Sequence, residues 1–234
     1  MSFVIQAPAQ VSVPVVGKAE RFPVHRIYCV GRNYVEHAKE MGFTGREPPF
    51  FFLKPADAIV VASVGEAGAT ATMPYPSLTK DLHHEIELVV AIGVGGKNIK
   101  AADASKHIYG YAVGLDMTRR DLQGEMKKLG RPWCIGKAFD ASAPIGPITP
   151  AAAAGDVANA EIYIQVNGKD RQRSNVSKLI WNIGETIEHI SAAWELQPGD
   201  LIYSGTPEGV NAVVAGDTMY GSVTGLTPIT VKVQ

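Results

Sequence analysis

The alternation of apolar and polar residues along this chain predicts many short strands separated by turns. Residues 85–93 form a run rich in β-branched and large apolar side chains, which favours a strand. Because side chains alternate faces along a strand, Glu85 and Glu87 should project to one side, and the intervening apolar residues to the other. Further strands are predicted at residues 26–30, 50–53, 109–115, 161–166, 201–204, 217–220 and 227–233. The pattern as a whole indicates a strand-rich α+β fold.

Helical patterns are fewer. They mark residues 34–41, 101–107, 118–129 and 184–194, of which the last is the clearest amphipathic segment. Asn33 and Thr118 are the expected N-caps of the first and third helices, and Gly42 and Gly130 are the expected stops. Asn167-Gly168, directly after an alternating strand, predicts a hairpin with a type I′ turn.

The composition is that of an ordinary globular protein, with 46% hydrophobic and 19% charged residues. We expect residues 1–24 to form a Pro-punctuated arm, residues 25–234 a single domain, and the alanine-rich residues 151–159 a surface loop. A net charge of −1 gives no electrostatic case for nucleic acid or an anionic membrane as a partner. Without a signal peptide or an apolar segment long enough to span a bilayer, the expected location is the cytoplasm. Cys29 and Cys134 should then be buried free thiols.

The two glutamates carry the first chemical hypothesis. Neighbouring carboxylates resist burial unless a proton or a cation neutralises them, and Asp116 adds a third acid at the end of another apolar strand. Such an all-oxygen donor set favours Mg²⁺, Mn²⁺ or Ca²⁺ over Zn²⁺. The alternative is a solvated strand face with Asp116 as a helix cap. His83 and His84 face opposite ways, so at most one could be a ligand, and supporting roles are expected for both.

Three more segments could carry chemistry. His37 and Glu40 share one helix face at i and i+3, where the carboxylate could orient the imidazole as a general base for water. A surface pair without a catalytic role would have the same spacing. Lys137, in an apolar context, is either a snorkelling side chain or a fixed internal cation. The loop Gly205-Thr206-Pro207 is either an ordinary turn or a set of backbone amides that receives a carboxylate.

Taken together, these segments resemble the fumarylacetoacetate hydrolase family over about residues 25–234, most closely its short members that act on acylpyruvates. The motifs that carry the resemblance are Gly31-Arg32-Asn33-Tyr34, the residues from Leu82 to Glu87, those from Gly114 to Thr118, those from Arg120 to Gln123, Gly136-Lys137, and those from Gly205 to Val210. The fold that the resemblance implies is a mixed β-sandwich roll, usually seen as a homodimer.

The resemblance also implies roles for individual residues. Mg²⁺ or Mn²⁺, with Ca²⁺ as a substitute, would bind Glu85, Glu87 and Asp116. The implied base pair is His37 with Glu40, and the implied anion-stabilising residues are Lys137 and Gln123. The expected substrate-binding residues are Arg32, Tyr34, Arg120 and Thr206.

The implied reaction is hydrolysis of the C–C bond of a 2,4-diketo acid, a small-molecule partner. The favoured substrate is fumarylpyruvate, which would give fumarate and pyruvate in gentisate-type aromatic catabolism. Its second carboxylate needs an extra cation, for which Arg32, Arg119 and Arg120 are candidates. The alternatives are oxaloacetate decarboxylation, keto–enol isomerisation and, in a different class, a non-catalytic binding protein stabilised by a metal.

Overall fold

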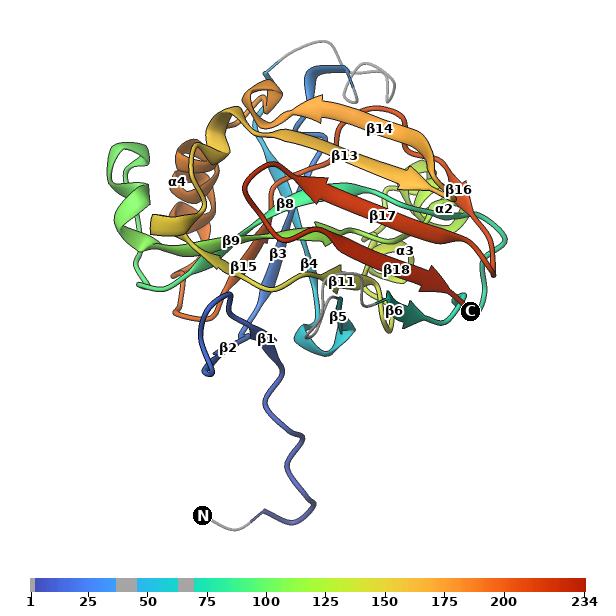
Figure 1. Ribbon diagram of the computed structural model, residues 1–234, viewed down its shortest axis with the longest axis horizontal. Coiled ribbons are helices and arrows are strands. Elements are labelled where there is room, and N and C mark those ends of the chain that lie inside the picture. The colour runs from blue at the N-terminus through green and yellow to red at the C-terminus, as the bar shows by residue number, and fades with distance from the viewer. Residues whose placement is uncertain (1–2, 37–45, 63–69) are drawn as a thin grey trace.

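Two facing β-sheets dominate the molecule (Figure 1). The computed structural model describes residues 3–36, 46–62 and 70–234. Within these ranges the larger sheet has eight strands, and its pairing is mixed because β3 runs parallel to β15, and β5 parallel to β11. Its order is β4 (Phe50–Lys54), β3 (Ile27–Gly31), β15 (Leu201–Tyr203), β8 (Ile86–Ile92), β9 (Ile108–Leu115), β11 (Ala143–Ile145) and β5 (Ile59–Val61), with β12 (Thr149–Pro150) beside β9.

The second sheet covers the first (Figure 1). Its order is β14 (Lys169–Asn175), β13 (Glu161–Val166), β17 (Thr218–Val223), β18 (Ile229–Val233) and β6 (Thr70–Met73). One hydrophobic cluster joins the two layers, with Leu88 and Val113 from the larger sheet and Ile162 and Val231 from the smaller. Asn167 and Gly168 both have positive φ, 51° and 75°, so the predicted type I′ turn is confirmed. These layers form the expected mixed β-sandwich.

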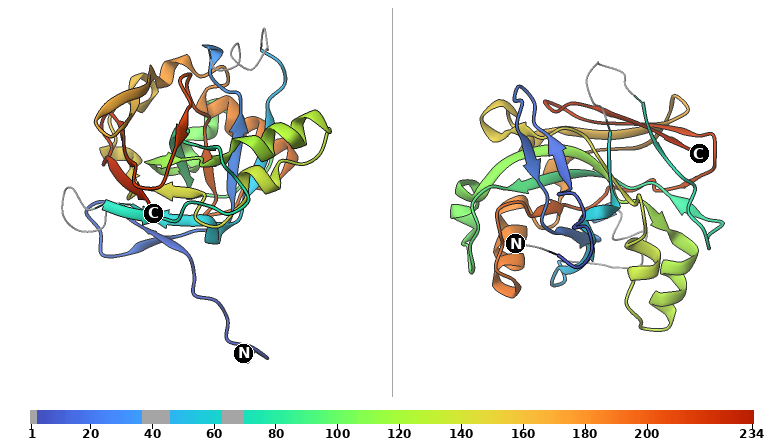
Figure 2. Two further views of the ribbon diagram at one scale, coloured as in Figure 1. Left: turned by 90° about the vertical axis from the view of Figure 1, so that its right-hand side faces the viewer. Right: turned by 90° about the horizontal axis from the view of Figure 1, so that it is seen from below.

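The helices lie at opposite ends of the larger sheet (Figures 1 and 2). At one end, α4 (Ile183–Ala193) buries Ile187 and Ile190 against Tyr28 and Val90, beside the 3-10 helix η2 (Ala101–His107). A capping box of Asn182 and Glu185 begins α4. At the other end, α2 (Arg120–Lys128) packs on α3 (Cys134–Lys137). No helix in the described ranges is long and apolar enough to cross a membrane.

The N-terminal segment contributes a small hairpin to the core. Strands β1 (Ser12–Pro14) and β2 (Arg21–Pro23) pair with each other and bury Val13 and Phe22 in a cluster with the larger sheet. Residues 3–9 run away from the body (Figure 1 and the left view of Figure 2). The remaining short elements are β7 (Leu82–His83), β10 (Thr118–Arg119), β16 (Ala212–Val213), η1 (Ala56–Ala58), η3 (Ala151–Ala153), η4 (Val157–Asn159) and η5 (Val176–Lys178).

Three local expectations were wrong. Thr118 does not cap a helix but begins β10, and α2 starts after it at Arg120. Asn33 uses its side chain for contacts with Trp181 and Ser204 instead of capping. Residues 151–159 form the expected surface segment, which contains two 3-10 turns and buries only Ala154 and Val157 against the core. Cys29 is buried, but Cys134 is exposed at the start of α3. Most of the helix expected at 34–41, and Gly42, lie outside the described residues.

Candidate active site

The register between β8 and β9 brings the three acidic residues together. Glu87 pairs with Gly114, and the Asp116 N–H donates to the carbonyl oxygen of Glu85 over 2.9 Å. One carboxylate oxygen from each of Glu85, Glu87 and Asp116 lies within 4.8 Å of the others, and all three residues are buried. The alternation of side chains along the strand therefore places both glutamates on the side that Asp116 reaches.

Fixed cations surround these carboxylates. The Lys137 Nζ lies 2.7 Å from Glu85 and 2.8 Å from Asp116, and the Arg120 guanidinium donates to the other oxygen of Glu85. The Nζ of Lys54, at the end of β4, lies 2.9 Å from Asp116 and also donates to the Lys137 carbonyl oxygen. These three cations formally balance the three carboxylates. Lys54 was not among the sequence candidates, although its place directly after the apolar run 50–53 and before Pro55 was the available signal.

The packing of α2 on α3 holds Lys137 and Arg120 in place. A side chain at Gly136 would meet the Gln123 backbone nitrogen at 2.8 Å, so only glycine allows the two helices to approach this closely. On α2, the Arg120 guanidinium donates to the Gln123 Oε1 over 2.7 Å. Behind it, the His83 Nδ1 lies 3.4 Å from the Arg120 Nε, and the His83 Nε2 is 2.9 Å from Asp81. His83 thus supports an arginine that touches a carboxylate of the cluster.

The negative charge of Glu87 is the least compensated of the three carboxylates. Burial, together with the charges of Asp116 and Glu85, raises the pKa of Glu87 well above its usual range, against one hydrogen bond of 2.8 Å from the Gly205 N–H. Burial alone would lower the pKa of Lys137, but the charges of Asp116 and Glu85 outweigh it and raise that pKa. A divalent cation would relieve the repulsion that Glu87 experiences.

The space among these groups fits a small cation. A cavity of about 20 Å³ is enclosed by residues that include all three carboxylates, and it can hold one water-sized species. The donors around it are carboxylate oxygens without sulfur or imidazole, the set that Mg²⁺ and Mn²⁺ prefer. The other candidates on its wall are Arg32, Lys137 and Thr206. Glu85, Glu87 and Asp116 therefore fit Mg²⁺ or Mn²⁺ as the cofactor.

A larger pocket of about 540 Å³ adjoins this cavity, since Arg32, Phe52, Trp133 and Lys137 line both. Arg32 adopts the left-handed conformation, with φ of 55°. Its guanidinium lies 5.2 Å from the ring centre of Phe50 and 5.7 Å from that of Trp133, distances of a cation–π contact. Arg32 thus stands between the carboxylates and an aromatic pocket large enough for a small organic acid.

The loop after β15 closes the remaining side of the cavity. Gly205 has a φ of 104°, and a side chain there would come within 2.6 Å of the Asn33 Cβ. The Asn33 amide donates to the Ser204 carbonyl oxygen over 2.8 Å and to that of Trp181 over 2.9 Å. These contacts join the ends of β3 and β15 and place Thr206 on the cavity wall.

Other candidates lie elsewhere. Tyr34 is buried, its hydroxyl has no hydrogen-bond partner among the described residues, and it is not on the wall of the small cavity. The Arg119 guanidinium lies 4.4 Å from the Phe139 ring centre, and Arg119 lines neither pocket. Burial lowers the pKa of His84 to about 4, which keeps its ring neutral. His37 and Glu40 lie outside the described residues.

Comparison with known proteins agrees with this arrangement. A family model described as fumarylacetoacetate (FAA) hydrolase C-terminal matches residues 26–234. The chain is 54% identical to a fumarylpyruvate hydrolase from Pseudomonas aeruginosa, solved with Mn²⁺ and pyruvate, with 99% of each chain covered and a TM-score of 0.96. It is 46% identical over 187 residues to a fumarylpyruvate hydrolase from Ralstonia sp, which covers 80% of this chain and 93% of that protein. It is also 38% identical over 209 residues to a mitochondrial oxaloacetate tautomerase from Arabidopsis thaliana, covering 89% of this chain and 91% of that protein.

Proposed function

The chain belongs to the fumarylacetoacetate hydrolase family, and we propose that it hydrolyses fumarylpyruvate to fumarate and pyruvate. The observation that carries the proposal is the buried cluster of Glu85, Glu87 and Asp116 in a chain whose 54% identical relative was solved with Mn²⁺ and pyruvate. The enzyme is thus a hydrolase that acts on the C–C bond of a ketonic substrate, a 2,4-diketo acid.

The charge of the cluster supports an anionic substrate. The three carboxylates and the three cations Lys54, Lys137 and Arg120 are together formally neutral, so a bound divalent cation would leave an excess positive charge. Mg²⁺ or Mn²⁺ held by Glu85, Glu87 and Asp116 would draw in the 2-oxo acid end of the substrate and neutralise the charge that develops as pyruvate departs.

The proposed hydrolysis consumes one water molecule, one proton of which passes through His37 to the departing carbon. Water loses a proton to His37, which Glu40 orients, and the hydroxide adds to the C4 carbonyl. The C3–C4 bond then breaks, its electron pair stays on C3 as pyruvate enolate, and a proton is finally delivered to that carbon. Lys137 and Gln123 would stabilise the oxyanion at C4. The substrate itself would be held by Arg32, Tyr34, Arg120 and Thr206.

The contacts that Lys137 makes in this structure limit how it could stabilise an oxyanion. Its ammonium donates to Glu85, Asp116 and the Thr118 hydroxyl, which accounts for all three of its N–H bonds. Stabilisation of the oxyanion therefore requires Lys137 to exchange one of these partners for the substrate.

A coupled pyruvate-release assay tests the proposal. Purified protein with Mg²⁺ or Mn²⁺ should release pyruvate from fumarylpyruvate faster than from acetylpyruvate, and chelation of the metal should abolish both activities. A clear preference for acetylpyruvate would overturn the choice of substrate. Absence of turnover on every diketo acid would favour a non-catalytic binding protein instead.

Keto–enol isomerisation of oxaloacetate is the second candidate, because several relatives at 37–39% identity are oxaloacetate tautomerases. It would conserve substrate mass, whereas oxaloacetate decarboxylation would release carbon dioxide, so mass spectrometry of the products separates the two. Decarboxylation needs no attacking water and should tolerate loss of His37 better than hydrolysis does.

We also propose that the enzyme is a cytoplasmic homodimer that serves gentisate-type aromatic catabolism, in line with the family resemblance. Sedimentation velocity would test the dimer, and growth of a deletion strain on gentisate would test the catabolic role.

A further inference from the structure

Gln172 is the one buried residue within an exposed stretch of β14, and its side chain touches both halves of the candidate site. It is 1% exposed, while Arg171 and Arg173 on either side are exposed. Its Oε1 accepts from the His84 Nδ1 over 2.9 Å and from the Ile86 N–H over 3.2 Å. These two donors lie on either side of Glu85, so the amide contacts the chain directly at a proposed metal ligand.

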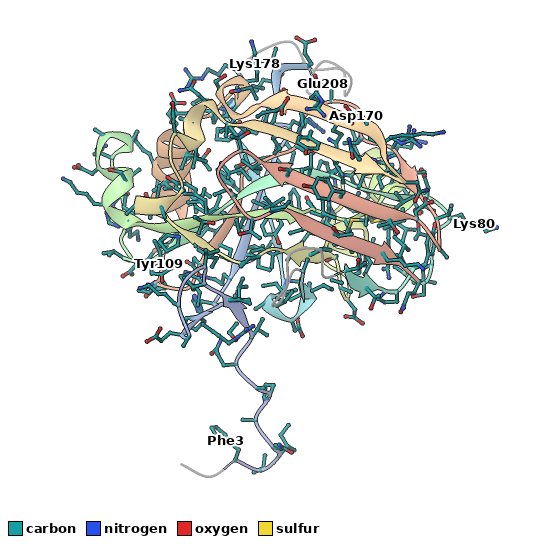
Figure 3. The ribbon with its side chains drawn as sticks, in the orientation of Figure 1. Phe3, Lys80, Tyr109, Asp170, Lys178 and Glu208 are labelled. Atoms are coloured by element: carbon teal, nitrogen blue, oxygen red, sulfur yellow. The ribbon has the colours of Figure 1, made fainter. Side chains whose placement is uncertain are left out.

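The other end of the same amide holds the loop after β15. The Gln172 Nε2 donates to the Thr206 hydroxyl over 2.8 Å and to the Pro207 carbonyl oxygen over 2.7 Å. Figure 3 shows Glu208, from this loop, beside Asp170 of β14, in agreement with those bonds. Both donors and both acceptor positions of the amide are thus used.

These partners fix the direction of every hydrogen bond in the group. A backbone N–H, that of Ile86, can only donate, and a carbonyl oxygen, that of Pro207, can only accept, so the amide has one possible orientation. His84 must then carry a proton on Nδ1, because the Gln172 Oε1 that it meets can only accept. The buried Nε2 of His84 has no partner among the described residues.

The Thr206 hydroxyl is constrained in the same way. It accepts from Gln172, and within the described part of the chain it donates to no other residue, so its own proton is available. Thr206 lines the cavity with Glu85, Glu87 and Asp116. A substrate carboxylate bound against that cavity would be an acceptor that suits this proton, and a hydrogen bond to a charged acceptor is stronger than one between neutral groups.

We propose that Gln172 is a positioning residue that fixes the Thr206 hydroxyl as a donor to the carboxylate of the 2-oxo acid. The inference rests on the proposed function. Gln172 makes no contact with the substrate in this account and acts only through Thr206.

A double-mutant cycle with pyruvate as the ligand tests the proposal. Thr206→Val removes the hydroxyl, and in the presence of saturating Mg²⁺ it should raise the Kd of pyruvate about tenfold. Gln172→Glu keeps the acceptor for Ile86 and His84 but replaces the donors, so the Thr206 hydroxyl would turn to the new carboxylate. It should therefore raise the Kd by a similar factor. The double variant should bind within about twofold of Thr206→Val alone, because a missing hydroxyl cannot be misdirected.

Titration calorimetry gives the Kd, and the pyruvate-release assay on fumarylpyruvate should show a raised KM with kcat changed by less than about threefold. Lys169→Gln, an exposed change on the same strand, should behave as wild type. Thr206→Ser, which keeps the hydroxyl, should raise the Kd less than Thr206→Val does. A double variant that multiplies the two single effects, to about a hundredfold, would overturn the proposal. So would a Gln172→Glu variant that binds pyruvate normally.

A measurement on the wild-type protein covers the case in which Gln172→Glu does not fold. Nitrogen-15 spectra of the Mg²⁺-loaded enzyme should show a proton on the His84 Nδ1, and an Nδ1 without a proton would refute the amide orientation on which the inference depends. If wild type released no pyruvate from fumarylpyruvate, the proposed function would fail, whereas the pyruvate-binding cycle would still report on Gln172.

Discussion

Replacing Glu87 with Gln separates two effects of charge in the carboxylate cluster: the repulsion among the carboxylates and their pairing with buried lysines. Glu87 is buried, and among the described residues no Lys or Arg side chain lies within ion-pair distance of it. Asp116, in contrast, lies between Lys54 and Lys137. In the metal-free protein Glu87→Gln should therefore relieve repulsion, whereas Asp116→Asn should leave two buried lysines without a full counter-charge.

The pKa of Glu87 determines the sign and the size of the effect. A carboxyl whose pKa is raised by folding holds its proton more tightly in the folded state, so the metal-free protein loses stability as the pH rises from the usual value of 4.5 towards the raised pKa. Inside that window the loss is about 1.4 kcal/mol per pH unit. Gln cannot ionise, so the variant should lack this slope, and it keeps an oxygen to accept from the Gly205 N–H. Asp116→Asn should cost about 3 kcal/mol.

Urea unfolding of the metal-free proteins at a series of pH values above 5 measures both quantities. The free energies of unfolding of wild type and Glu87→Gln should diverge with rising pH, with the variant the more stable. Both variants should lose Mn²⁺ binding by calorimetry. Parallel pH curves, or a Glu87→Gln variant as destabilised as Asp116→Asn at neutral pH, would refute the charge distribution described above.

Three further changes test other parts of the site. Lys54→Met should destabilise the metal-free protein by about 3 kcal/mol and increase the rise in Tm on adding Mn²⁺, while the exposed change Lys80→Met should do neither. Equal Tm increments for Lys54→Met and wild type would contradict the pairing of Lys54 with Asp116. His37→Ala should lower kcat by about a hundredfold or more with Mn²⁺ affinity unchanged, and surviving activity would exclude it as the base. Arg32→Gln should raise the KM for fumarylpyruvate about tenfold more than the KM for acetylpyruvate. Arg119→Gln should leave the ratio of the two KM values unchanged. The reverse result would assign recognition of the second carboxylate to Arg119 instead of Arg32.

Much of this architecture could be predicted because it depends on local pattern. The alternation along residues 85–93 places Glu85 and Glu87 on one side, and the apolar run before Asp116 ends where the register requires. The hairpin turn at Asn167-Gly168 could be predicted because these two residue types readily adopt the positive φ angles that a type I′ turn requires. The family resemblance, confirmed by the match over residues 26–234, then indicated the chemistry that spacing had left open.

The site residues that the sequence did not identify act through partners distant in sequence. Lys54 follows an apolar run, but neither its position nor that of Gln172 identifies the partner that its side chain reaches. Their roles depend on Asp116 and Thr206, far along the chain. Thr118 suited a helix cap by residue type, but its hydroxyl is engaged by Lys137, so tertiary contacts overrode the local preference. Buried polar contacts of this kind are fixed only when the sheets and helices assemble.

The most direct test of the central claim is pyruvate release from fumarylpyruvate by the purified enzyme, measured with Mn²⁺, after chelation, and for Glu87→Gln with Mn²⁺ restored. Metal-dependent turnover by wild type alone is the predicted result. Equal turnover after chelation, or by the Glu87→Gln variant, would contradict the assignment of the carboxylate cluster as the catalytic metal site.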